Sequence, residues 1–181
     1  MITTQSALLV IDMQKGSFTP ATPRFAAQEV VQRINALAEV FRATNAPVIF
    51  IQHDGTREGA FVPGAQDWEL LDELEIKSSD MVWAKTANDS FYQSGLQQKL
   101  TELGVAEVFA AGCATDFCVA ATIQSALAKD LNVTVVGDAH TTADRPHLPA
   151  GKVIEHYNWV WANMIPTKGK IRVIETARIV A

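Results

Sequence analysis

Three side chains of this sequence could together cleave an amide-like bond: the thiol of Cys118, the carboxylate of Asp12 and the amine of Lys85. Cys118 follows an apolar run and a glycine turn, where a segment of helical periodicity begins. A thiol at the start of a helix meets free N–H groups and the positive end of the helix dipole, which favour the thiolate. Lys85 would lower the pKa of the thiol further, and Asp12 could accept its proton. The three residues would supply a nucleophile, its base and an electrostatic partner.

Each of these residues also has a purely structural interpretation. Cysteine behaves as a small hydrophobic residue, so Cys118 could be one more core residue. Asp12, which follows an apolar run, could be a turn residue at a strand end, and Lys85 could be a solvated loop lysine. The interpretations are linked, because one fold would place all three residues at the same edge of a sheet.

The turn before Cys118 contains the other cysteine, Cys113, which we expect to be structural. A turn that leads into a helix directs several backbone N–H groups at one point, so those of Ala114 and Cys118 are candidates for an oxyanion hole. Ligand sites are mostly apolar with a few polar anchors. The aromatic residues near strand ends include candidates for substrate contact, as does one histidine that could instead be a polar loop residue: Phe18, Phe91, Phe117 and His53.

Neither a metal ion nor another cofactor is expected. The chain has four histidines. Asp138 and His140 form an Asp-x-His spacing after a predicted strand, but one such pair is a poor zinc signal without a third ligand.

Composition and charge exclude several classes of protein. Hydrophobic residues make up 48% of the 181 residues and charged residues 19%, as in a globular protein, and the length fits one domain over residues 1–181. The net charge is −5 without a basic run, which argues against nucleic-acid binding. The apolar runs are too short to span a membrane, and we see no signal peptide. Two cysteines five residues apart favour a reducing cytoplasm, and the expected partner is a small-molecule substrate.

Short apolar runs alternate with longer segments of helical periodicity. The runs predict six strands, at residues 7–12, 48–52, 80–85, 105–111, 133–136 and 170–174. The helical segments lie at residues 22–41, 94–104, 115–129 and 150–165. Thr22 and Pro23 resemble the start of a helix, and Ser94 with Gln97 forms a capping-box pattern. This alternation predicts an α/β fold: a three-layer, Rossmann-like, six-stranded, mostly parallel sheet with helices on both faces.

The predicted fold brings the reactive residues together. Ligands of such sheets bind beyond the carboxyl ends of the strands. Asp12 ends the first strand, Lys85 ends the third, and Cys118 follows the fourth. The long segment 53–79, with at most a helical turn near residues 68–74, is expected to be a functional loop.

Three motifs resemble those of one family, the isochorismatase-like cysteine hydrolases. They are residues 8–14 (LLVIDMQ), Lys85 before the pair Ser90-Phe91, and residues 112–119 (GCATDFCV), in that order. The family includes nicotinamidases, N-carbamoylsarcosine amidases, ureidoacrylate and streptothricin hydrolases, and isochorismatase. The resemblance implies a six-stranded parallel sheet, a triad of Asp12, Lys85 and Cys118, a cis peptide bond at Cys113–Ala114, and a homo-oligomer.

One departure from the family pattern bears on the substrate. Nicotinamidases have an Asp-x-His after the second strand and a further histidine, which together hold a metal. Here residues 51–55 read IQHDG, so neither that metal site nor nicotinamidase activity is expected. Isochorismatases cleave a vinyl ether and need no nucleophilic thiol, so Cys118 favours C–N hydrolysis through a thioester.

Two other functions remain open at this point. The first is vinyl-ether hydrolysis of an isochorismate-like acid, for which Arg57 or Arg145 would have to supply a basic pocket. The second is a binding protein on the same fold without catalysis.

The last predicted helix carries an aromatic residue outside its apolar stripe. Trp159 lies opposite the face formed by Val153, Tyr157, Val160, Trp161 and Met164. Exposed aromatic residues among polar neighbours are enriched at interfaces, so we expect a homo-oligomer that uses this helix. If the helix phase is off by one residue, Trp159 is instead a core residue.

Overall fold

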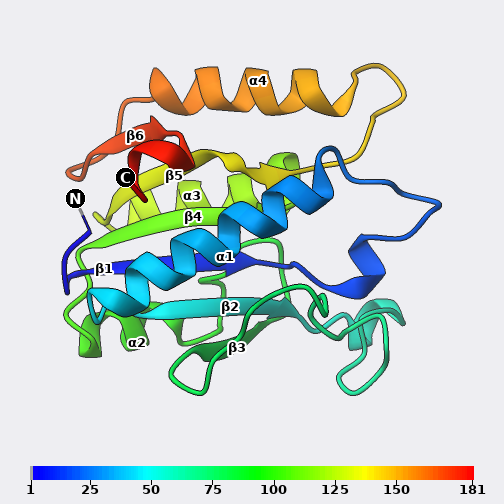
Figure 1. Ribbon diagram of the computed structural model, residues 1–181, viewed down its shortest axis with the longest axis horizontal. Helices are drawn as coiled ribbons and strands as arrows, with labels where there is room; N and C mark the ends of the chain where they lie inside the picture. The colour runs from blue at the N-terminus through cyan, green and yellow to red at the C-terminus, as the bar shows by residue number, and fades with distance from the viewer. Residues whose placement is uncertain (1) are drawn as a thin grey trace.

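The computed structural model describes residues 2–181 and contains one six-stranded sheet (Figure 1). The strands are β1 (Ser6–Ile11), β2 (Val48–His53), β3 (Met81–Lys85), β4 (Glu107–Cys113), β5 (Asn132–Thr141) and β6 (Ile171–Ile174). Their order in the sheet is β3-β2-β1-β4-β5-β6, and all five pairs are parallel. The predicted α/β fold with a parallel sheet is confirmed. The fifth strand is longer than the apolar run alone indicated.

Helices cover both faces of the sheet, because the strands are apolar on both sides. Ala7, Leu9 and Ile11 of β1 face one core, and Leu8 and Val10 face the other. Helix α1 (Ala27–Ala43) packs on the second core. Helices α2 (Leu96–Glu102), α3 (Ala120–Ala128) and α4 (Ala150–Ala162) contribute to the first. In Figure 1, α1 accordingly lies in front of the sheet and α3 behind it.

The start of α1 differs from the prediction. The helix begins at Ala27, after Ala26 in a left-handed conformation with a φ of 49°. Thr22 does not cap it, because its N–H donates to the carbonyl of Thr19 and its hydroxyl lies 3.0 Å from that of Thr19. The hydroxyl of Thr22 therefore takes part in a local turn with Thr19 and does not cap the helix.

The capping box predicted for α2 is also absent. Gly95 is the N-cap residue, with a φ of 75°. The hydroxyl of Ser94 accepts a hydrogen bond from the N–H of Leu96 and donates one to the carbonyl of Ser90. Ser94 thus ties the segment after β3 to the start of the helix.

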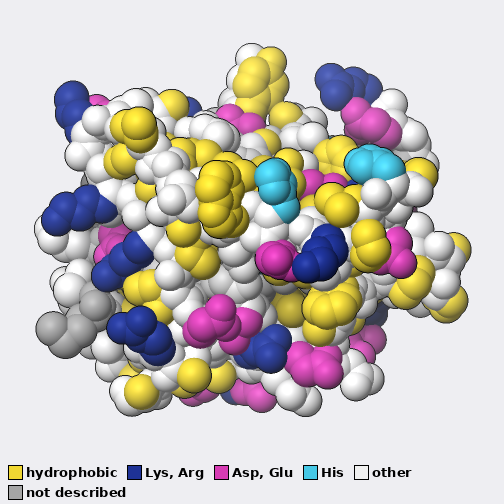
Figure 2. Space-filling view, turned by 90° about the horizontal axis from the view of Figure 1, so that it is seen from above, with side chains coloured by type: hydrophobic (Ala, Val, Ile, Leu, Met, Phe, Trp, Pro, Cys, Tyr) yellow, Lys and Arg dark blue, Asp and Glu magenta, His cyan; other side chains and the backbone are white. Residues whose placement is uncertain are grey.

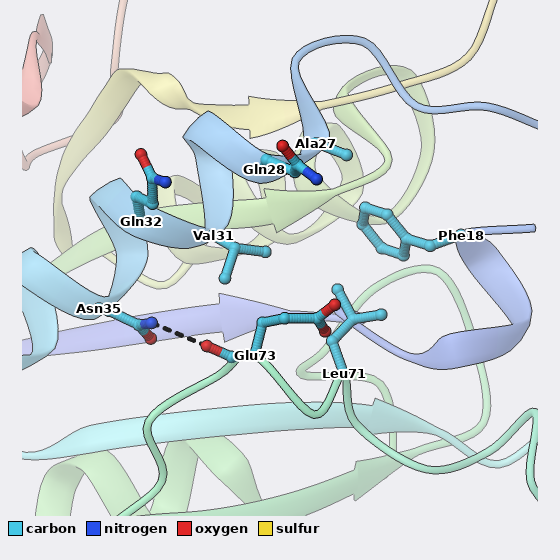
Figure 3. A pocket seen from close by; sticks show the side chains of 8 residues that line it. All are labelled: Phe18, Ala27, Gln28, Val31, Gln32, Asn35, Leu71 and Glu73. Atoms are coloured by element: carbon cyan, nitrogen blue, oxygen red, sulfur yellow. Dashed lines mark hydrogen bonds between the residues drawn. The ribbon is translucent and has the colours of Figure 1, made fainter.

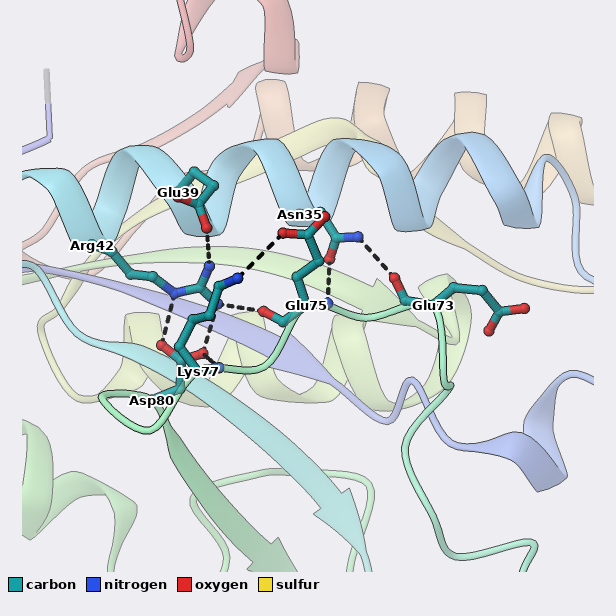
Figure 4. Close-up of polar contacts among 7 residues, drawn as sticks. All are labelled: Asn35, Glu39, Arg42, Glu73, Glu75, Lys77 and Asp80. Carbon is teal, nitrogen blue, oxygen red and sulfur yellow. Dashed lines mark hydrogen bonds and ion pairs between the residues drawn. The ribbon is translucent and has the colours of Figure 1, made fainter.

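The long connection between β2 and β3 is held against α1 by polar contacts (Figure 4). Arg42 of α1 forms a bidentate pair with Asp80, at 3.0 and 2.6 Å, and also donates to the carbonyl of Glu75. The amide of Asn35 donates to the carbonyl of Glu73 and accepts from the N–H of Glu75. The 3-10 helix of this connection spans Thr56–Glu58. Residues 68–74, where a helical turn was considered, contain turns, bends and an isolated bridge between Leu70 and Gln14. The loop is therefore anchored at its far end, next to β3.

Helix α4 presents its predicted outer face to solvent. Trp159 is 66% exposed and Trp161 only 1%, so the predicted helix phase is confirmed. In Figure 2 the molecule is seen from the side on which α4 lies, and apolar and histidine side chains share this surface. No helix among residues 2–181 is long and apolar enough to cross a membrane.

Candidate active site

The side chains of Asp12, Lys85 and Cys118 meet at the carboxyl edge of the sheet, as predicted from the strand ends. Asp12 directly follows β1 and turns the chain with a φ of 46°. The ammonium nitrogen of Lys85, the last residue of β3, lies 2.7 Å from Asp12 Oδ2 and 3.4 Å from Cys118 Sγ. One buried cation therefore contacts both a carboxylate and a thiol.

The ion pair between Lys85 and Asp12 is buried. The side chain of Lys85 has no exposed surface and that of Asp12 is 8% exposed. Lys85 Nζ also donates to the carbonyl of Ala87 at 2.8 Å. A buried charge persists only when it is paired and hydrogen-bonded, and Lys85 meets both conditions. Its interpretation as a solvated loop lysine is wrong.

The environment of Cys118 differs from the prediction in one respect. The residue lies in a π-helical turn, Thr115–Val119, that leads into α3. Burial raises the pKa of its thiol, and the charge of Asp12 raises it further, while Lys85 opposes both. The thiol is therefore protonated at neutral pH, whereas the helix start and Lys85 alone had indicated a thiolate. Besides Lys85, Sγ lies 3.5 Å from Asn88 Oδ1.

The turn before Cys118 requires glycine at its first position. Gly112 has a φ of 118°, and a Cβ there would collide with the backbone of Ile11 in the neighbouring strand. The peptide bond between Cys113 and Ala114 is cis, as the family resemblance implied. Cys113 is 2% exposed, and burial raises the pKa of its thiol to about 12. Its expected structural role fits this placement.

Ala114 and Cys118, the residues predicted to form an oxyanion hole, belong to this turn and to the π-helical segment that follows it. The carbonyl of Ala114 accepts from the N–H groups of Phe117 and Val119. The N–H of Ala114 donates none of the hydrogen bonds found outside the helices and strands of the described chain.

A cavity of about 120 Å³ opens onto the thiol. Its lining combines predicted and unpredicted residues: Asp12, Gln14, Ser17, His53, Phe61, Asn88 and Cys118. Gln14 and Asn88 follow strand ends at β1 and β3 by three residues, which is the signal that could have identified them. Ser17 ends a short 3-10 helix, Lys15–Ser17, and Phe61 lies in the connection between β2 and β3, so neither directly follows a strand end.

The predicted aromatic contacts are largely placed elsewhere. Phe91 is 6% exposed in the core beside α2, and Lys129 lies over its ring at 5.3 Å, so it is a core residue. Phe117 is half exposed beneath Arg145, whose guanidinium lies 4.9 Å from the ring centroid. Phe18 lines a separate pocket of about 480 Å³, where it faces Val31 of α1 (Figure 3). Of the four predicted contacts, His53 alone lines the cavity at the thiol.

Comparisons with known proteins identify the family of this chain. Residues 6–165 match the isochorismatase domain. The chain belongs to the isochorismatase family. It is 34% identical to a streptothricin hydrolase of Streptomyces noursei over 79% of this chain and 52% of that protein. It is 33% identical to an uncharacterized isochorismatase family protein of Bacillus subtilis over 76% of this chain and 78% of that protein.

A solved isochorismatase family structure superposes on this chain with a TM-score of 0.87 at 30% sequence identity. It covers 96% of this chain and 100% of its own. The chain spans about half the length of the streptothricin hydrolases that it matches. Fold and family are therefore shared over nearly the whole chain.

The residues that could have made a metal site in this isochorismatase-family chain serve other roles. No group of three potential metal ligands occurs among the described residues. The ring nitrogens of His140 lie 2.9 Å from the Thr115 hydroxyl and 2.9 Å from Asn158 Oδ1. Burial lowers the pKa of His140 to about 4, so its ring is neutral. The histidine thus ties the turn that carries Cys118 to α4.

The arginines considered for a basic pocket are engaged elsewhere in this family member. Arg145 forms a bidentate pair with Asp116 at 2.7 and 2.8 Å. Arg57 is paired with its neighbour Glu58, and its side chain is 84% exposed. Within the described chain, the cavity lining at Cys118 includes no arginine.

Proposed function

We propose that this chain is a cysteine-dependent hydrolase that cleaves an amide-like C–N bond of a small molecule through a thioester. The observation that carries the proposal is the position of Lys85 Nζ, 2.7 Å from Asp12 and 3.4 Å from Cys118 Sγ. A nucleophile, a base and a cation within contact distance, beside a cavity, are the parts that covalent acyl transfer needs.

The reaction begins with proton transfer. The raised pKa of Cys118 means that the thiol must lose its proton as it attacks, and Asp12 accepts it. Sγ forms a bond to the carbonyl carbon, and the electron pair of the C=O bond moves to oxygen. The N–H groups of Ala114 and Cys118 stabilise this oxyanion, and Lys85 balances the charge of the site.

The second half restores the enzyme. The C–N bond breaks as Asp12 gives its proton to the departing nitrogen, which leaves a thioester on Cys118. Water then attacks the thioester, Asp12 accepts a proton from the water, and the acid leaves as Sγ regains the proton.

The relatives and the site favour this reaction over the alternatives. The streptothricin hydrolases are hydrolases by name, and this chain shares the family's domain with them. Vinyl-ether cleavage of a dicarboxylic acid would need cations in the cavity, where Arg57 and Arg145 do not reach. A binding protein would gain nothing from a buried Asp12–Lys85 pair, because such a pair is often no more stabilising than apolar packing. The two free cysteines fit a reducing cytoplasm, where we place the protein.

A screen of small amides, ureides and lactams tests the proposal. Acid-quenched reactions should contain protein heavier by one acyl group, attached to Cys118. Cys118→Ala should abolish hydrolysis and the adduct, while Cys113→Ala, the matched control in the same turn, should keep both. Wild-type turnover by Cys118→Ala would refute the thioester mechanism.

A further inference from the structure

His53 is fixed at the edge of the cavity. It is the last residue of β2 and pairs in register with Lys85 of β3. The side-chain amide of Gln14 accepts from the N–H of His53 at 2.8 Å and donates to its carbonyl at 3.1 Å. The imidazole packs edge-on against Phe61, with ring centroids 6.1 Å apart. The ring therefore has a defined place beside Asp12 and Cys118, with which it lines the cavity.

The imidazole has an unused hydrogen-bonding atom. In residues 2–181, three buried side-chain nitrogen or oxygen atoms lack a partner: His53 Nδ1, Asp12 Oδ1 and Trp68 Nε1. Two of these three belong to residues that line the same cavity. A buried polar group without a partner is destabilising, so its persistence calls for an explanation. The structural histidine His140 differs from His53, because both of its ring nitrogens have hydrogen-bond partners.

The imidazole of His53 is suited to hydrogen bonding with a neutral group. Burial lowers the pKa of His53, and the nearby charge of Lys85 lowers it further. A neutral imidazole has one donor and one acceptor nitrogen, so it can pair with a hydroxyl in either direction.

The cavity limits the size of what reaches the thiol. Its volume is about 120 Å³. An apolar cavity of about 150 Å³ is large enough for benzene. The smaller volume favours a group smaller than an aromatic ring next to the reacting carbonyl.

We propose that His53 determines specificity, by hydrogen bonding to a hydroxyl or similar polar group on the carbon next to the scissile carbonyl of a short aliphatic substrate. The inference rests on the proposed function, because it assumes that the carbonyl carbon is attacked by Cys118. It adds the chemical class of the acyl group: small, aliphatic and polar.

Aldehydes test the inference without requiring turnover. A thiol adds to an aldehyde: the S–C bond forms, and the thiol proton passes to the carbonyl oxygen. Lactaldehyde and isobutyraldehyde have similar shapes and differ by a hydroxyl in place of a methyl group. Each aldehyde is added to the protein at increasing concentration at pH 8.5, and Cys118 is then alkylated with excess iodoacetamide. Mass spectrometry of the Cys118 peptide gives the fraction alkylated. The protecting concentration of each aldehyde is normalised to its reaction with free cysteine.

In the wild type, lactaldehyde should protect Cys118 at a concentration at least 10-fold lower than isobutyraldehyde. In His53→Leu the two should differ by less than threefold, because only lactaldehyde loses a partner. His53→Asn, which keeps a polar atom near the position of Nδ1, should regain part of the preference. His156→Leu, a matched change on the surface of α4, should behave as wild type. Benzaldehyde should protect at least 10-fold less well than isobutyraldehyde.

An equal aldehyde ratio in wild type and His53→Leu would overturn the inference alone; if both aldehydes are weakened equally, the role of His53 is structural. Protection by benzaldehyde as strong as by isobutyraldehyde would contradict the size limit. Hydrolysis of the screened substrates by Cys118→Ala at the wild-type rate would refute the proposed function, and the inference with it.

Discussion

The ammonium of Lys85 lies 2.7 Å from the carboxylate of Asp12 although their strands, β3 and β1, are separated in the sheet by β2. Neighbouring strands lie about 4.8 Å apart, so the two backbones are separated by about 10 Å, and the long lysine side chain spans this distance. Both side chains are almost completely buried, which limits screening of the pair by salt. Cys118 therefore faces an ion pair and not an isolated charge, which distinguishes this site from a simple thiolate–cation pair.

Asp12→Asn should separate the two roles of this carboxylate. Hydrolysis should fall by about 10²- to 10⁴-fold, because the base and proton donor is lost. Alkylation of Cys118 by iodoacetamide should not fall, because the charge of Asp12 is one of the causes that raise the pKa of the thiol. The measurements are kcat/KM and the rate of alkylation at pH 7.5, on protein shown to be folded by circular dichroism.

Asp130→Asn is the control for this change, since Asp130 pairs with Lys168 on the surface. It should alter neither rate. Hydrolysis by Asp12→Asn at the wild-type rate would remove Asp12 from the mechanism.

Removal of metal ions should leave hydrolysis unchanged. The cavity lining offers one carboxylate, already paired with Lys85, and one imidazole, that of His53. Catalytic zinc sites generally use three protein ligands. Dialysis against a strong chelator, with turnover measured before and after, checks this expectation. A loss of activity that a divalent ion restores would show that the site is metal-dependent.

His140 should make stability depend on pH. Burial lowers its pKa from 6.5 to about 4 in the folded protein. Between these values the unfolded chain binds more protons, so the free energy of unfolding decreases as the pH falls below 6.5 and levels off near 4. From pH 7 to pH 5 this histidine should contribute a loss of about 2 kcal/mol, at about 1.4 kcal/mol for each pKa unit.

Urea unfolding of wild type and His140→Gln at both pH values isolates this contribution. The amide of glutamine has the donor and acceptor needed to contact Thr115 and Asn158, but it does not titrate. The variant should lose about 2 kcal/mol less than wild type between pH 7 and 5. Equal losses would assign the pH dependence to other groups.

We expect the chain to associate with itself through the exposed face of α4. Trp159 is 66% exposed there. Figure 2 shows the molecule from the side on which α4 lies. Sedimentation at micromolar concentration should detect at least a dimer, and Trp159→Glu should shift it toward monomer. Val82→Glu, which places the same charge on an exposed residue of β3, is the control. A monomeric wild type would contradict the expectation, and normal assembly of Trp159→Glu would locate the interface elsewhere.

Local patterns in the sequence determined the main features of the fold. The alternation of apolar runs and helical periodicity gave six strands and four helices in the order found. Because the carboxyl ends of parallel strands meet at one edge, the positions of Asp12, Lys85 and Cys118 along the chain were enough to place them together. The outward direction of Trp159 followed from helix periodicity alone.

Tertiary structure decided what periodicity cannot encode: burial and the neighbours of each side chain. Phe91 and Phe18 lie near strand ends as His53 does, yet packing places Phe91 in the core and Phe18 beside α1. Thr22 has the chemistry of a helix cap, but a contact with Thr19 occupies its hydroxyl. The protonation of Cys118 is set by desolvation and by the charge of Asp12, which comes from a strand more than 100 residues earlier in the chain. Contacts between such distant residues exist only once the sheet has formed.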